Sequence, residues 1–226
     1  MKVQVWSDFV CPFCYIGQRH LENAIKEVDP SIEIEFISYE LDPNHVDNLD
    51  VSMAQELANK YGMSLEEAHA NNDRVKGMAE QAGLHYNFET MKHSNTFKAH
   101  KLFQFAKAQG KGNELSEILM DAYFSKGAYL NDESELIELA SQAGIDKETA
   151  QSVLDNDDFG LKVRQDEQHA ASLGVKGVPH FVIDDQVFLS GAQPVETFKQ
   201  ALMHVKTLNF NNASSDMLCE DGVCKV

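Results

Sequence analysis

The first forty residues consist of two stretches in which apolar and polar residues alternate, separated by one amphipathic stretch of helical periodicity. Val3 and Val5 alternate with polar residues in Lys2–Asp8, which predicts a buried strand, while Cys14–Val28 repeats apolar residues at helical spacing until Pro30. In Ile32–Glu40, isoleucine and phenylalanine alternate with glutamate, which predicts a second strand. A strand–helix–strand unit of this kind is normally right-handed and parallel.

The middle of the chain, from about Asp50 to Asp155, carries only helical signals. Ser64 and Glu67 have the spacing of a capping box, so we expect a helix there that ends near Gly83. Apolar periodicity and capping residues predict further helices. They are Asn95–Ala108, a helix around Leu115–Tyr123, one that begins after Asn131 or Asp132 and ends at Gly144, and a short one after Asp146.

The last part of the chain mixes both kinds of pattern. We expect a long helix, two short strands, a final helix and an Asn/Ser-rich linker, in the order Phe159–Leu173, Phe181–Ile183, Gln186–Leu189, Val195–Val205 and Asn209–Ser215. Polar residues at Asp184-Asp185 separate the two strands, which is typical of a β-hairpin.

Together these elements predict an α/β protein with the thioredoxin arrangement, in which β-α-β is followed by α-β-β-α. The α-helical insertion divides that arrangement into two parts. We therefore expect a thioredoxin-like domain from residues 1–45 and 156–208, a helical insertion domain at 46–155, and a flexible tail at 209–226.

The net charge and the apolar runs of the chain argue against several classes of function. The 226 residues carry a formal net charge of -17, which disfavours binding to nucleic acid or to anionic membrane surfaces. No apolar run is long enough to span a bilayer. A cleaved leader of roughly 15–30 residues would remove Cys11, so we expect Met1 to be the true start and the protein to be cytoplasmic.

The candidate chemistry lies in Cys11-Pro12-Phe13-Cys14, between the first strand and the first helix. Free N–H groups at a helix N-terminus stabilise a thiolate, the form that attacks disulfides. A second thiol one helical turn away can then resolve the mixed disulfide. In a cytoplasmic chain, cysteines indicate catalysis or metal binding rather than structural disulfides.

Three segments give the chain a family resemblance. They are Trp6–Gly17 (WSDFVCPFCYIG), Ser94-Asn95-Thr96, and Gly177-Val178-Pro179 at the start of the third strand. With them the chain resembles the DsbA-like branch of the thioredoxin superfamily, and most of all the cytosolic FrnE-type proteins, which also carry a second cysteine pair in the tail.

This resemblance implies a thiol–disulfide oxidoreductase or isomerase. It implies that Cys11 is the attacking thiol, Cys14 the resolving thiol, and Pro179 a cis proline beside them. We expect Pro12, Phe13 and Val178 to contact the substrate, which would be glutathione or a protein that contains a thiol or a disulfide. No cofactor and no metal are expected, and a homodimer is left open.

Two other functions compete with this interpretation. The architecture is also similar to kappa-class glutathione transferases and 2-hydroxychromene-2-carboxylate isomerases, which typically have a serine where Cys11 stands, so two thiols favour disulfide exchange. The non-enzymatic alternative is a zinc-binding thiol module. Cys219 and Cys224 could form a second redox pair, a local disulfide or part of a metal site.

Several polar residues near these segments have less certain roles. Asp8 could assist proton transfer at Cys14, but a polar group at the strand end or a helix cap is the preferred interpretation. His93 and His100 flank the Ser-Asn-Thr segment and are expected to be surface or packing residues. His93 and His180 could also line the thiol site.

Overall fold

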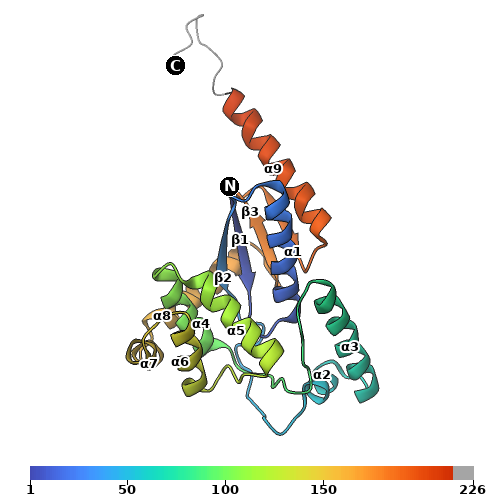
Figure 1. The fold of residues 1–226 in the computed structure, drawn as a ribbon, viewed down its shortest axis with the longest axis vertical. Coiled ribbons are helices and arrows are strands. Elements are labelled where there is room, and N and C mark those ends of the chain that lie inside the picture. Colours follow the sequence, from blue (N-terminus) through green and yellow to red (C-terminus); the bar gives the residue numbers. More distant parts are fainter. Residues whose placement is uncertain (216–226) are drawn as a thin grey trace, which may run out of the picture.

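A mixed four-stranded sheet lies at the centre of the computed structural model, which describes residues 1–215 (Figure 1). Its strands are β1 (Lys2–Ser7), β2 (Glu33–Ser38), β3 (His180–Ile183) and β4 (Val187–Ser190), in the order β2-β1-β3-β4. Strand β1 runs parallel to β2 and antiparallel to β3, and β4 is antiparallel to β3. The predicted parallel unit and the predicted hairpin are both confirmed.

Different helices cover the two faces of the sheet, and side chains at alternate strand positions point toward opposite faces. Val5 pairs with Phe36 on β2 and with Phe181 on β3, and all three belong to the main core. Helices α1 (Pro12–Val28) and α9 (Val195–Ser215) pack together beside this face, where Phe181 meets the ring of Phe198 at 4.7 Å.

The opposite face of the sheet carries a smaller apolar cluster. Trp6 and Val182 lie there with Ala170 of helix α8 (Asp158–Ser172). The indole N–H of Trp6 donates to the carbonyl oxygen of Asp166, also on α8, at 3.4 Å. Helices therefore cover both faces, and the end of β1 is held between them.

The segment between β2 and α8 is helical, as predicted. Its helices are α2 (Met53–Tyr61), α3 (Leu65–Gln81), α4 (Phe97–Ala108), α5 (Gly112–Lys126), α6 (Glu133–Gln142) and α7 (Lys147–Asp155). Figure 1 shows α2 and α3 on one side of the lower part of the molecule and α4 to α7 on the other.

The predicted helix caps are confirmed at three helices. Ser64 and Glu67 form the reciprocal capping box of α3. The side chains of Asp132 and Asp146 accept backbone N–H groups at the starts of α6 and α7. Helix α2 was not predicted individually, although Ser52 caps it and Gly62 ends it with a φ of 65°.

The hairpin turn has the backbone that its sequence requires. Asp184 and Asp185 have φ values of 45° and 57°, the positive region that tight hairpin turns use and that Asp tolerates. Asp184 also accepts the side-chain N–H of Asn209 at 2.8 Å, and Gln186 donates to that same asparagine at 2.8 Å.

Two predicted boundaries were wrong. Helix α1 begins at Pro12 rather than Cys14, because proline suits the first helical position. The predicted linker Asn209–Ser215 instead continues α9, which was expected to end at Val205. Contacts of Asn209 with the hairpin favour this extension. Cys219 and Cys224 lie outside the described residues.

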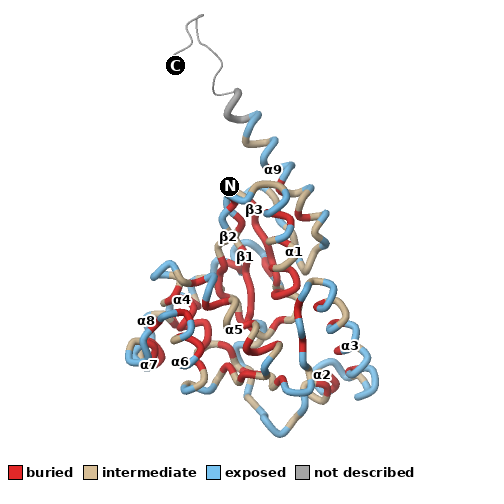
Figure 2. The backbone as a smooth tube through the Cα atoms, viewed as in Figure 1, coloured by how far each residue is buried: buried red, intermediate tan, exposed pale blue. Residues whose placement is uncertain are grey.

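The buried core is continuous from the sheet into the helices that follow β2, as the red tube in Figure 2 shows. Leu102 of α4 and Leu119 and Tyr123 of α5 belong to the same cluster as Val5. Within residues 1–215, none of the helices has both the length and the apolarity that crossing a bilayer needs. The shared core positions the helices against the end of β1.

Candidate functional site

The two predicted thiols lie on the turn that joins β1 to α1. Cys11 is the N-cap of α1 with extended backbone angles (φ -86°, ψ 111°), and Pro12 is the first helical residue. The backbone N–H of Cys11 donates to the carbonyl oxygen of Asp8 at 3.2 Å. The N–H of Cys14 donates to the carbonyl oxygen of Cys11 at 3.0 Å. This turn places both sulfurs at the start of the helix.

The loop that precedes β3 lies against these thiols, as the sequence predicted for Val178 and Pro179. The Val178–Pro179 peptide bond is cis. The Cys11 thiol donates to the carbonyl oxygen of Val178, with a sulfur–oxygen distance of 3.6 Å. Cys11 and Val178, which are 167 positions apart in the sequence, thus meet at the Cys11 thiol.

A hollow of about 420 Å³ adjoins this loop. It is lined by Leu41, residues 174–180, Ser190 and Gly191. Gly17 of α1 lets the helix approach the loop closely, since an added Cβ would lie 3.3 Å from Pro179 and 3.1 Å from the ring of Phe181. The hollow therefore opens beside the cis proline.

The two thiols have different environments. Both residues are buried, with 3% of Cys11 and 1% of Cys14 exposed. Burial is the main cause that raises the pKa of the Cys14 thiol well above its ordinary value, and the hydrogen bond and charge of Cys11 raise it further. Burial therefore favours the neutral form of the Cys14 thiol.

The sequence did not identify Tyr86 as a neighbour of the thiol turn. Its hydroxyl donates to the carbonyl oxygen of Pro12 at 2.8 Å, and its ring stacks on Phe124 at 4.4 Å. Pro12 and Phe13 are half-buried in this contact region. Gly83 indicates that a loop precedes Tyr86, but no local pattern gives the partner of its hydroxyl.

A polar network joins α1 to α5 one turn beyond the thiols. The hydroxyl of Tyr15 donates to Glu117 at 2.6 Å, and the guanidinium of Arg19 pairs with both Glu117 and Glu22. Burial, together with the carboxylate of Glu117, raises the pKa of Tyr15. The network fixes the direction of α1 relative to α5, and so the position of Cys14.

Asp8 lies beneath the thiol turn and pairs with His100. Both side chains are 1% exposed, and Asp8 Oδ1 lies 3.3 Å from His100 Nε2. The other carboxylate oxygen accepts the N–H of Leu41 at 2.7 Å. Asp8 is thus a polar group at the strand end rather than the cap of α1, and His100 is a buried packing residue rather than a surface one.

His93 and His180, which the sequence suggested could line the thiol site together, lie in different parts of the structure. His180 lines the hollow beside Pro179, its Nδ1 lies 2.9 Å from Ser190 Oγ, and burial lowers its pKa. His93 contacts His45 instead, with Nδ1 and Nε2 2.8 Å apart. Only His180 of this pair joins the site around the thiols.

Comparisons with known proteins agree with this geometry. A family model described as a DSBA-like thioredoxin domain matches residues 2–203. The chain is 31% identical to the uncharacterized protein YwbO of Bacillus subtilis (strain 168) over 204 residues, which are 89% of this chain and 96% of YwbO.

Solved structures share the fold. The crystal structure of the probable DsbA oxidoreductase SCO1869 from Streptomyces coelicolor is 37% identical with a TM-score of 0.86, covering 90% of this chain and 89% of that chain. A 2-hydroxychromene-2-carboxylate isomerase matches with 17% identity and a TM-score of 0.68, covering 93% of this chain and 98% of that chain. The predicted thioredoxin fold and the predicted DsbA-like resemblance are confirmed.

Proposed function

This chain belongs to the family of the DSBA-like thioredoxin domain, and on that premise we propose that it is a thiol–disulfide oxidoreductase or isomerase acting on proteins or glutathione. The observation that carries the proposal is the thiol pair itself. Cys11 caps α1 against the Val178–Pro179 loop, and Cys14 lies buried in the first helical turn.

The proposed reaction begins at Cys11. Its thiolate attacks one sulfur of a substrate disulfide, so a Cys11–substrate disulfide forms while the substrate's own S–S bond breaks and its second sulfur takes up a proton. Cys14 then loses its proton and attacks the Cys11 sulfur. A Cys11–Cys14 disulfide forms, the remaining substrate thiol leaves, and two electrons have passed from the enzyme to the substrate. Reversal of these steps oxidises a substrate dithiol.

The different environments of the two thiols support this division of roles. Burial raises the pKa of Cys14, which keeps it protonated and unreactive toward an arriving disulfide. We assign substrate contacts to Pro12, Phe13 and Val178, with Pro179 beside the mixed disulfide. The hollow at Pro179 provides room for the chain or the glutathione moiety attached to the substrate sulfur.

The fold alone does not select this chemistry, because a 2-hydroxychromene-2-carboxylate isomerase shares it. A transferase or isomerase of that kind needs only to activate the thiol of glutathione. A buried second thiol at Cys14 has no task in such a reaction but is required to resolve a mixed disulfide. Disulfide exchange is therefore the activity that the arrangement of residues favours.

Other parts of the proposal rest on the sequence. The assignment to the FrnE-type proteins, a cytoplasmic location, and a redox role for Cys219 and Cys224 remain predictions. A zinc-binding thiol module is the less favoured function, since only Cys11 and Cys14 come together among the described residues and a structural zinc site usually has four ligands.

A glutathione redox titration tests the proposal. The full chain is equilibrated across ratios of reduced to oxidised glutathione, free thiols are trapped by alkylation, and each cysteine is mapped by mass spectrometry. We expect Cys11 and Cys14 to change state together as a two-electron couple. A pair that does not titrate, or conjugation of an aromatic electrophile to glutathione without any disulfide exchange, would contradict the proposal.

A further inference from the structure

A second group of chemically capable side chains lies apart from the thiol pair. His45, from the loop after β2, Glu56, from the first turn of α2, and His93, from the loop before α4, each offer one ligand atom, and these atoms lie within 4.8 Å of one another. Among residues 1–215, this is the only group of three or more His, Cys, Asp or Glu side chains that meets this condition.

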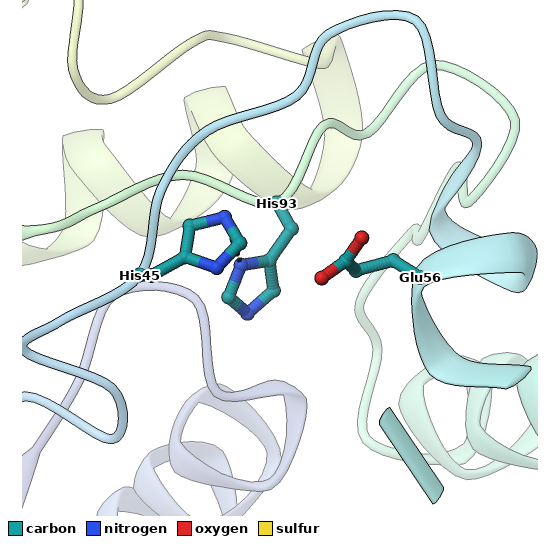
Figure 3. Close-up of side chains that lie close together, drawn as sticks. All are labelled: His45, Glu56 and His93. Carbon is teal, nitrogen blue, oxygen red and sulfur yellow. Dashed lines mark hydrogen bonds between the residues drawn. The ribbon is translucent and has the colours of Figure 1, made fainter. Parts of the chain in front are cut away.

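Figure 3 shows that the two imidazole rings lie side by side and that the carboxylate of Glu56 points toward them. His45 Nε2 and His93 Nδ1 are 2.8 Å apart, so one nitrogen holds a proton and the other accepts it. If the donor ring carries its proton on its other nitrogen instead, the two facing nitrogens both offer lone pairs, and a cation could bind between them.

The charges around the rings favour a cation. Asp47 Oδ1 lies 3.5 Å from His45 Nε2, and the carboxylate of Glu56 points toward the two rings (Figure 3). The ammonium of Lys60 is paired with Asp42 at 2.9 Å. Negatively charged groups therefore lie beside the ring nitrogens.

Asp47 is held firmly in its place beside His45. It accepts the backbone N–H of Asn95 and the side-chain N–H of Asn131, each at 2.7 Å, and the hydroxyl of Tyr129. These three hydrogen bonds hold the carboxylate in one orientation. Asp47 Oδ1 faces His45 Nε2, the nitrogen that also faces His93, so this fixed carboxylate places a negative charge beside the position between the rings.

We propose that His45, His93 and Glu56 bind one divalent transition-metal ion, with Zn²⁺ as the ion that fits this ligand set best. Two imidazole nitrogens and one carboxylate oxygen form a common set of three protein ligands for zinc, with water at the fourth position. The sequence prediction had included no metal.

The observed geometry is near to what zinc needs. In a tetrahedral site with bonds of about 2.0–2.1 Å, ligand atoms are about 3.3 Å apart. The imidazole nitrogens, now 2.8 Å apart, would separate slightly, and Glu56 would move closer from the first turn of α2. A bound ion would tie α2 to the loops that carry His45 and His93.

Zinc titration of the full chain tests the site by calorimetry. Because the thiols also bind zinc, the titration is done in a background in which Cys11, Cys14, Cys219 and Cys224 are all replaced by serine. We expect one ion per chain and a zinc-dependent rise in melting temperature.

Three variants and one control locate the ligands. His45→Gln and His93→Gln should each weaken zinc binding by at least about 100-fold, and Glu56→Gln by about 10–100-fold. His85→Gln, which changes an exposed histidine, should leave it unaltered. Glu56→Gln decides the question if a histidine variant fails to fold, because it leaves both rings in place. The proposal is wrong if the cysteine-free chain binds no zinc, or if these three substitutions do not weaken binding.

Discussion

The thiol site and the imidazole–carboxylate cluster are assembled in different ways. The two thiols come from one turn, are buried to 1–3% exposure, and meet one distant loop at Val178. His45, Glu56 and His93 come from three segments, are half-buried, and meet only because α2 and two loops converge. The positions of the two thiols are therefore set mainly by the residues of one turn. The positions of the three side chains of the cluster depend on how α2 and the two loops pack together.

The same difference predicts how the two sites respond to change. A substitution at the thiol turn should abolish disulfide exchange and leave the cluster intact. A substitution among the groups that support the cluster should weaken metal binding and leave the thiols unaffected. The predictions below test this independence, beginning with the largest expected effect.

Replacement of Cys11 by serine should lower disulfide-exchange turnover by on the order of 10³-fold or more, because the attacking sulfur is lost. Reduction of a protein disulfide under steady-state conditions measures the effect. Zinc affinity at the histidine cluster should not change. Substantial residual turnover would show that another group is the nucleophile.

Cys14→Ser is the matched variant for the resolving step. In this variant Cys11 can still attack a disulfide, but no second thiol can release it from the mixed disulfide that forms. Mixed disulfides with glutathione or protein should therefore accumulate. Mass spectrometry of the intact protein detects them. If no adduct forms while Cys11 remains reactive toward alkylating reagents, Cys14 is not the resolving thiol.

Asp47→Asn should weaken zinc binding by on the order of 10-fold, because it removes a negative charge that lies 3.5 Å from the ligating nitrogen His45 Nε2. Asparagine has nearly the same shape as aspartate and keeps one carbonyl oxygen, which can accept either the N–H of Asn95 or the hydroxyl of Tyr129. A competition titration against a chromophoric chelator measures the affinity. The glutathione titration of the thiols should be unchanged, and a shifted midpoint would show that the two sites are coupled.

Alkaline pH should destabilise the reduced protein through Cys14. The folded state raises the pKa of this thiol above 9.0, so the contribution to stability is complete below pH 9 and is lost as pH rises toward the folded-state pKa. The expected loss between pH 9 and pH 10 is on the order of 1 kcal/mol. Denaturant unfolding at pH 8, 9 and 10 under excess reductant measures it.

Cys14→Ala is the control for this pH dependence. The variant lacks the buried thiol, so its free energy of unfolding should fall less steeply than that of the parent above pH 9. Other groups that titrate in this range are common to both proteins. Equal slopes for the two proteins would mean that Cys14 ionises as readily in the folded state as in the unfolded chain.

The sequence predicted those elements that are determined by residues close together in the chain. The caps at Ser64, Asp132 and Asp146 act within three residues of themselves, and alternation of side chains located the strands. The cysteine motif likewise lies within one turn. These features need no knowledge of distant contacts.

Features that depend on distant partners were missed. Asn209–Ser215 has the composition of a linker, but Asn209 bonds to the hairpin residues Asp184 and Gln186, and the helix continues through it. His45 and His93 are 48 positions apart, and no spacing in the sequence links them to each other. Tyr86 is 74 positions from Pro12, whose carbonyl oxygen it meets.

Tyr86→Phe is the smallest change that tests the contact between the helical segment and the thiol turn. It removes the hydrogen bond to the Pro12 carbonyl oxygen but keeps the ring stacked on Phe124. The free energy of unfolding should fall by about 0.5–1.5 kcal/mol, the net contribution of one hydrogen bond. Denaturant unfolding measures this, and Tyr86→Ala, which also removes the buried ring, should cost about 3–5 kcal/mol. Because zinc binds elsewhere, Tyr86→Phe should alter the thiol titration more than the zinc affinity, and the reverse result would contradict the independence of the two sites.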